Sequence, residues 1–246
     1  MLRNSLYKGD VQYTISNENK IQTKKRKLDP LNVGYIIRDF EDLSIVKKCK
    51  SKDCFSNILS SRKPYGIRSD VFNTEEKYIH NSDKEGDYTL HGGKGYKGGT
   101  ERVIGYISPS EYVIEQNASE ISKWKLFFSK AYSIDATVPP EIVIAMPNVI
   151  CTEMYLRIGP FDTEFECKNC LNYIKTKFFR HLLQVRRFGM NMSQKIFNSI
   201  PLQNFTSNSD INWNESIPEI NKQLYDKYKL DDKERKWIEE KVKEME

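Results

Sequence analysis

The spacing of apolar residues predicts one long amphipathic helix at residues 163–188. The positions that form its apolar stripe recur every three or four residues: Leu171, Ile174, Phe178, Leu182 and Val185. Asp162 or Thr163 can cap the first turn, and Gly189 can end the helix. We therefore expect this segment to be the central packing helix, with Phe178 and Leu182 buried.

The rest of the chain predicts short strands, with shorter helices near both ends. Strands are expected at residues 11–15, 33–37, 71–72, 77–79, 88–90, 102–107, 124–129, 141–145 and 150–158. Short helices are expected within residues 40–59, near 109–116, and at 218–229 and 231–244. Strands and helices do not alternate regularly, as they would in a doubly wound sheet. The predicted fold class is therefore α+β, with a β-rich region, a long central helix and a helical C-terminal tail.

Changes in composition divide the chain into three segments. Residues 1–60 form an N-terminal hairpin and helical segment, residues 61–205 a mixed α+β core, and residues 206–246 a polar segment with a charged helical tail. In the first segment, five of the eight residues at 20–27 are basic. The apolar runs on either side predict that this cluster caps a hairpin, either as a solvated loop or as an arm that contacts phosphates.

The composition is that of a polar protein that can still build a core. The 246 residues include 12 Phe, 14 Tyr and 3 Trp, and the mean hydropathy is −0.66. No run of about 18 apolar residues is present, residues 1–10 lack the apolar stretch of a signal peptide, and five cysteines do not suit a disulfide framework. We expect a cytoplasmic protein without a membrane partner. The net charge of +5 permits a polyanionic partner without requiring one.

Three short motifs imitate catalytic or metal sites, but each has a simpler structural interpretation. Residues 93–98 spell G-x-G-x-x-G, yet a strand rather than a helix is predicted after them, which favours a glycine-rich hairpin over a dinucleotide site. Cys167 and Cys170 supply two of the four ligands that zinc needs, and both lie in the predicted helix. Asp162 and Glu166 imitate the acids of a Mg²⁺-dependent nuclease, but both belong to the helix start. We therefore assign no catalytic or metal-binding residue.

Basic and aromatic residues provide the remaining functional signal. The loop at residues 60–68 combines hydrogen-bond donors with a stacking face, and its candidate base or groove contacts are Arg62, Lys63, Tyr65 and Arg68. The alternative is that Tyr65 anchors the loop on the core and the cations are solvated. Further candidates for phosphate contacts are Lys94, Lys97, Lys130, Arg186 and Arg187.

Several segments together resemble a known family. Residues 60–68 (SSRKPYGIR), 123–131 (KWKLFFSKA), 150–162 (ICTEMYLRIGPFD), 171–183 (LNYIKTKFFRHLL), 200–205 (IPLQNF) and 224–235 (LYDKYKLDDKER) carry the resemblance. In this order they are similar to the C-terminal region of large adenine-specific DNA methyltransferases from bacterial restriction–modification systems. Some of those proteins are fused to an endonuclease. The polar stretch between Trp213 and Leu224 is longer than the family suggests.

The resemblance implies a target-recognition module for double-stranded DNA. Its partner would be a methyltransferase catalytic domain or subunit, which would bind S-adenosylmethionine, so no cofactor is expected in this chain. In agreement, the one Pro-Pro pair, at residues 139–140, lacks the polar and aromatic neighbours that grip a flipped adenine. Two alternatives remain open: a divergent Mg²⁺-dependent restriction endonuclease, and a non-catalytic protein-interaction scaffold.

Overall fold

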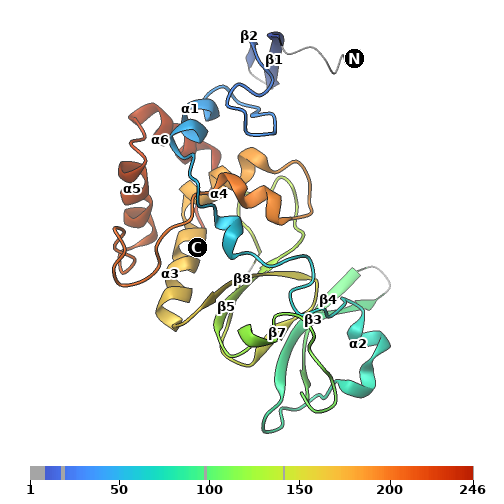
Figure 1. The fold of residues 1–246 in the computed structure, drawn as a ribbon. Helices are drawn as coiled ribbons and strands as arrows, with labels where there is room; N and C mark the ends of the chain where they lie inside the picture. Colours follow the sequence, from blue (N-terminus) through green and yellow to red (C-terminus); the bar gives the residue numbers. More distant parts are fainter. Residues whose placement is uncertain (1–8, 18–19, 97–98, 141, 246) are drawn as a thin grey trace.

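The computed structural model describes residues 9–17, 20–96, 99–140 and 142–245. Its elements follow one another in this order: β1 (Val11–Asn17), β2 (Lys20–Arg26), α1 (Asp42–Lys48), the 3-10 helix η1 (Phe55–Ile58), α2 (Val71–Thr74), η2 (Glu76–Tyr78), β3 (Tyr88–Tyr96), β4 (Gly99–Ile107), η3 (Ala118–Glu120), β5 (Trp124–Ser129), β6 (Val143–Ala145), β7 (Val149–Cys151), β8 (Tyr155–Phe161), α3 (Glu164–Lys175), α4 (Lys177–Arg186), η4 (Gln194–Ser199), α5 (Ile217–Lys227) and α6 (Asp232–Lys241). The predicted α+β fold class is confirmed (Figure 1). Within the described ranges, no helix has the length and apolar character needed to cross a membrane.

A three-stranded antiparallel sheet, in the order β6-β5-β8, lies between two hydrophobic cores. Successive side chains of a strand point to opposite faces, so one strand can serve both cores. On β5, Leu126 and Phe128 belong to the larger core, whereas Phe127 between them belongs to the smaller one. On β8, Leu156 and Ile158 face the larger core and Tyr155 the smaller one. The central sheet thus joins a helical half of the molecule to a β-rich half (Figure 1).

The larger core is built mainly by helices α1 and α3–α6. It contains residues from all three segments that the sequence suggested, for example Ile45, Phe178 and Ile238. The predicted boundaries at residues 60 and 205 therefore do not coincide with the boundary between the two cores. Phe178 and Leu182 are fully buried, as expected.

The smaller core combines residues of α2, of the sheet β4-β3-β7 and of the central sheet, for example Phe72, Leu90 and Phe127. In that sheet β3 pairs antiparallel with β4 and parallel with β7. Two glycines let Phe72 of α2 lie close against the β3–β4 hairpin: a Cβ at Gly92 would stand 2.4 Å from the Phe72 ring, and one at Gly105 would stand 2.8 Å from it. The glycine-rich segment is therefore a hairpin packed on a helix, which is the interpretation we favoured over a dinucleotide site.

The long helix expected at residues 163–188 is two helices, and the prediction of one continuous helix is wrong. Thr176 has extended dihedral angles, with ψ at 148°, and separates α3 from α4. Its hydroxyl accepts a hydrogen bond from the Phe179 N–H at 3.2 Å and donates one to the Tyr173 carbonyl at 2.7 Å. The side chain of Asn221, in α5, accepts from the Phe178 N–H at 2.9 Å. Local capping and a contact with a distant helix thus replace the helical hydrogen bonds lost at the break.

Of the other predicted elements, some are confirmed and others are wrong. The basic cluster at residues 20–27 does not cap a hairpin, because most of it forms strand β2 and pairs with β1. Residues 33–37 are not a strand, and residues 71–72 and 77–79 lie in or beside the short helices α2 and η2. The strands at 102–107 and 124–129 and the two C-terminal helices are confirmed to within a few residues. The helix expected near 109–116 is absent from this part of the described chain.

Candidate nucleic-acid interface

The loop at residues 60–68, called the basic loop below, is held to the central sheet at both ends. At its start the Ser60 N–H donates to the Arg157 carbonyl at 2.8 Å, and the Arg157 N–H donates to the Ser60 hydroxyl at 3.0 Å. At its end the Glu153 N–H donates to the Ile67 carbonyl at 3.0 Å. These bonds join the loop to β8 and to the turn before it, so its side chains project from a fixed backbone.

Tyr65 anchors this loop and does not offer a stacking face to bases. Its side chain belongs to the smaller core and is 1% exposed. Burial also raises the pKa of its hydroxyl above the ordinary value. The neighbouring Pro64 carbonyl accepts from the Asn117 side chain at 2.6 Å, and Gly66 has a φ of +77°, where a side chain would be strained. The structure therefore favours the anchoring interpretation of Tyr65, because a buried ring cannot contact DNA without unfolding the loop.

The cations of the basic loop are more exposed to solvent than Tyr65. The side chain of Arg62 is 76% exposed, and its Nε lies 3.5 Å from a carboxylate oxygen of Glu153. Lys63 is half-buried. The guanidinium of Arg68 is exposed and pairs with Asp70 at 3.0 Å. Both arginines are thus oriented by an acid while most of their surface faces solvent.

Lys130, at the end of β5, lies within electrostatic range of the same loop. Its N–H donates to the Met154 carbonyl at 3.0 Å, which places it beside the turn that carries Glu153. Partial burial lowers the pKa of Lys130, and the positive charges of Arg62 and Lys63 lower it further, while Glu153 opposes them. The structure therefore brings together three of the predicted residues, Arg62, Lys63 and Lys130, which we call the cation cluster.

Arg102 is an additional cation near this site that the sequence analysis did not select. From β4 its guanidinium donates to the Ser129 hydroxyl at 2.8 Å, next to Lys130 in the chain, and lies 5.9 Å from the Tyr155 ring centre. The strand prediction at residues 102–107 was correct, but it did not show that β4 lies beside the end of β5. No local sequence signal reports that proximity.

Lys94, in the glycine-rich segment, lies on a paired strand. Lys94 is exposed on strand β3, where it stands opposite Glu101 of β4. Lys97 lies outside the described residues. The hairpin pairing of β3 with β4 constrains Lys94 more than the sequence suggested.

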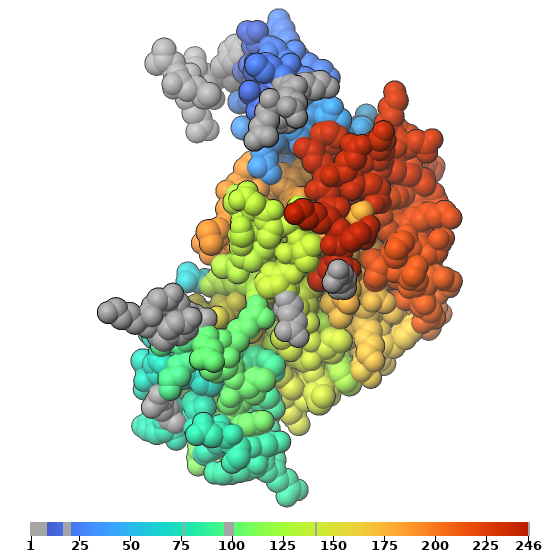
Figure 2. All heavy atoms as spheres, turned by 180° about the vertical axis from the view of Figure 1, so that it is seen from behind, coloured from blue at the N-terminus to red at the C-terminus, as the bar shows by residue number. Residues whose placement is uncertain are grey.

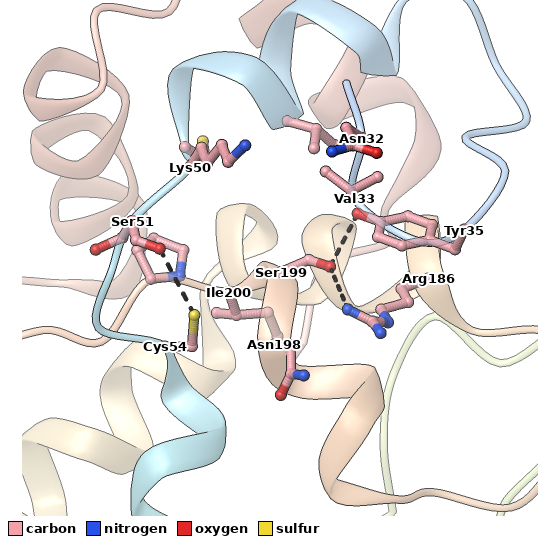
Figure 3. A pocket seen from close by; sticks show the side chains of 13 residues that line it. Asn32, Val33, Tyr35, Lys50, Ser51, Cys54, Arg186, Asn198, Ser199 and Ile200 are labelled. Atoms are coloured by element: carbon pink, nitrogen blue, oxygen red, sulfur yellow. Dashed lines mark hydrogen bonds between the residues drawn. The ribbon is translucent and has the colours of Figure 1, made fainter. Parts of the chain in front are cut away.

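Arg186 lies at a separate hollow of about 230 Å³, lined also by residues of α1, of the segment before it and of η4 (Figure 3). Its guanidinium donates to the Ser199 hydroxyl at 3.5 Å and lies 4.7 Å from the Tyr35 ring centre. Ser199 in turn donates to the Tyr35 hydroxyl at 2.9 Å. Among the described residues, none of these partners belongs to the basic loop, so the structure does not join Arg186 to the cation cluster.

Arg187 cannot serve as the phosphate contact that we expected, because its side chain is 2% exposed. Its guanidinium donates to the backbone carbonyls of Tyr132 at 2.5 Å and Ser133 at 2.7 Å, and it lies 3.7 Å from the Tyr132 ring centre. Burial lowers its pKa. The charge is used to satisfy carbonyl groups of the 132–136 segment, so Arg187 supports the fold.

The residues that imitate chemical motifs lie in structural settings. Cys167 and Cys170 are buried in α3, and burial raises the pKa of the Cys167 thiol to about 12. Thr163 is the cap of α3, and its hydroxyl accepts from the Glu166 N–H at 3.2 Å, while the Glu166 carboxylate accepts from the Asp162 N–H at 3.0 Å. Over the described ranges, no three His, Cys, Asp or Glu side chains are grouped as a metal site would require.

Comparisons with known proteins add no relative to this picture. No protein-family model, curated protein sequence or solved structure matches the chain.

Proposed function

We propose that this chain is a sequence-specific recognition module for duplex DNA in a bacterial restriction–modification enzyme. It would position an adenine-specific DNA methyltransferase, with or without a fused nuclease, on its target in the cytoplasm. The observation that carries the proposal is the cation cluster: Arg62 pairs with Glu153 at 3.5 Å, and the Lys130 N–H donates to the carbonyl of the next residue, Met154, at 3.0 Å. The ordered resemblance to methyltransferase C-terminal regions supplies the identity of the DNA-modifying partner.

The cluster fits a polyanion for an electrostatic reason. Burial is the main cause of the lowered pKa of Lys130, and repulsion by the nearby charges of Arg62 and Lys63 lowers it further, while Glu153, which pairs with Arg62, opposes both. A phosphate group would relieve the repulsion, and each phosphate contact would release condensed counterions from DNA. Folding alone would favour dispersing such charges over the surface.

The fixed backbone of the basic loop suits Arg68 for base recognition. An arginine that reads guanine must hold its guanidinium in a set direction, and both the loop hydrogen bonds and the Asp70 carboxylate restrict that direction. Lysines of the cluster meet phosphates with less geometric demand. We therefore assign base contact to Arg68 and phosphate contact to Lys63 and Lys130.

Salt-dependent binding of the whole chain to duplex DNA tests the proposal. Replacing Lys63 and Lys130 together by alanine should weaken binding to all sequences and flatten the salt slope by about one for each lost contact. Arg68→Ala should cost about 1–3 kcal/mol on the preferred site and little on scrambled DNA. The matched control replaces Lys222 and Lys236, two exposed lysines of α5 and α6, and should leave binding unchanged.

The possible results separate the candidate functions. Equal affinity and salt slope for the wild type and the Lys63/Lys130 variant would remove the cation cluster from the interface. Absence of any DNA binding would favour the scaffold alternative. Nicking of a plasmid in the presence of Mg²⁺ would favour the endonuclease alternative. If the proposal is right, the chain should also increase target methylation by a catalytic domain that lacks its own recognition region.

A further inference from the structure

The N-terminal strands β1 and β2 form a two-stranded antiparallel ribbon with two different faces. Directly opposed residues share a face, and their register places Gln12 beside Lys25, Thr14 beside Thr23 and Ser16 beside Ile21. All six of these side chains are exposed, and Ile21 is 73% exposed. We call this set the outer face of the ribbon.

The opposite, inner face attaches the ribbon to the body. The Tyr13 ring packs edge-on against Phe40 at 5.9 Å between centres, and the Arg26 guanidinium lies 4.0 Å from the Tyr13 ring centre. Arg26 also donates to the Ile37 carbonyl at 2.5 Å. Lys24 turns to the same side and lies 4.4 Å from the Phe40 ring centre. These contacts orient the ribbon so that its outer face points away from the protein.

The outer face has an unusual composition for a solvated surface. Neither strand contains an acidic residue, whereas β2 contains four Lys or Arg in the sequence KIQTKKR. On the outer face itself every side chain except Ile21 can donate a hydrogen bond. The Thr14 and Thr23 hydroxyls lie 2.9 Å apart and so hold each other in position across the ribbon. The outer face is thus an ordered row of donors and acceptors with one cation, Lys25, and no acid, while Lys24 and Arg26 lie on the inner face.

We propose that the ribbon enters the major groove of the DNA target and reads base edges with its outer face. This inference rests on the proposed function and adds a second recognition element to it. Strands in a pair lie about 4.8 Å apart, and a two-stranded ribbon fits the major groove, which is about 12 Å wide. Gln12 suits adenine, Lys25 suits guanine, and Ile21 can contact a thymine methyl group.

The position of the ribbon makes it separable from the basic loop in an experiment. The ribbon projects from one end of the molecule, and the β3–β4 hairpin lies at the other end in both views (Figures 1 and 2). The cation cluster lies at the end of β5, and its ion pair with Glu153 and its hydrogen bond to Met154 involve no residue of β1 or β2. Substitutions at the two places should therefore act independently.

Selection from a randomised duplex pool, followed by affinity measurement on the selected sequence, tests the ribbon. Lys25→Ala combined with Gln12→Ala should lower affinity for the selected sequence about 10- to 100-fold and erase the preference at adjacent base pairs. Binding to scrambled duplexes should fall much less. The matched control is Lys24→Ala, which removes the same charge from the neighbouring residue on the inner face and should leave the selected sequence unchanged. Unfolding temperatures of all variants establish that the fold is intact.

The results distinguish this inference from the proposed function. If the Gln12/Lys25 variant selects the same sequence with the same affinity, while the Lys63/Lys130 variant loses binding, the ribbon does not read DNA and the proposed function stands. If Lys24→Ala has the same effect as the Gln12/Lys25 variant, the ribbon contributes only general charge and the face-specific proposal is wrong. If the wild-type chain binds no duplex, both proposals fall together.

Discussion

Replacing Lys125 by methionine should change how the stability of the protein depends on pH. Lys125 lies on the central strand β5 and is 0% exposed. Its ammonium group donates to the backbone carbonyls of Ile121 at 2.7 Å and Lys123 at 2.8 Å, with a third contact to Met146 at 3.4 Å. It forms no ion pair with a described carboxylate, so its hydrogen bonds go to neutral carbonyl oxygens alone.

The expected size of this pH dependence follows from the burial of the Lys125 charge. Burial lowers the pKa of Lys125 from its usual 10.5 to about 8. A pKa difference of this size corresponds to about 3 kcal/mol between the protonation states. Between pH 8 and pH 10.5 the unfolded chain binds more protons at this lysine than the folded chain does. Stability from this group therefore rises with pH in that window, and below pH 8 the full cost of burying the cation is present.

Urea unfolding of the wild type and of Lys125→Met between pH 7 and pH 10.5 measures this effect. The free energy of unfolding of the wild type should increase relative to the variant by up to about 3 kcal/mol across the window. Loss of hydrogen bonds to the three carbonyls will shift the variant at every pH, but it will not change the slope of the difference. Buried tyrosines are common to both proteins and cancel in the same way.

A control variant separates burial from general loss of charge. Lys236→Met removes a lysine whose side chain is 77% exposed on α6, and its pH curve should run parallel to that of the wild type. Parallel curves for the wild type and Lys125→Met between pH 8 and pH 10 would refute the reasoning, because they would mean that Lys125 titrates alike in the folded and unfolded chains.

Three further outcomes are expected. Leu182→Ala, which truncates a fully buried side chain of α4, should lower the free energy of unfolding by about 2–5 kcal/mol, and an unchanged melting temperature would count against the packing described here. Thr176→Val keeps the volume but removes the hydroxyl that caps α4, so it should cost about 1–3 kcal/mol in chemical denaturation, whereas no loss would mean that the cap is dispensable. S-adenosylmethionine should not shift the melting temperature of the isolated chain; a dose-dependent rise, worth about 2.7 kcal/mol at 100 times the dissociation constant, would contradict the assignment of cofactor binding to a partner domain.

The predictable part of the fold consists of elements whose pattern is local. The apolar stripe through Phe178 and Leu182 and the apolar run in β5 identified buried elements correctly, because side-chain periodicity depends only on backbone geometry. The break between the two helices at Thr176 could not be predicted from local periodicity. A threonine is tolerated inside a helix, and the hydrogen bond from the Phe178 N–H to Asn221 comes from a helix more than forty residues away.

In the candidate site, too, the sequence predicted some features and only the packing revealed the others. The sequence suggested base or groove contacts for Arg62 and Lys63 and phosphate contacts for Lys130 and Arg187, but a charge in the sequence does not reveal whether backbone carbonyls will surround it. Packing buried Arg187 among carbonyls of the 132–136 segment and left Arg62 exposed. The alternation of residues 11–16 could have indicated a two-faced ribbon, yet only the pairing with β2 showed which face is free.

By itself, the amino-acid sequence determined the fold class and the apolar positions of the main helices. These properties follow from the periodicity and chemistry of neighbouring residues. The tertiary structure alone decided that Tyr65 is an anchor, that Lys130 joins Arg62 and Lys63, and that the outer face of the ribbon points to solvent. Each of these depends on contacts between residues far apart in the chain, which local pattern does not encode because burial and electrostatic proximity arise only when the elements pack together.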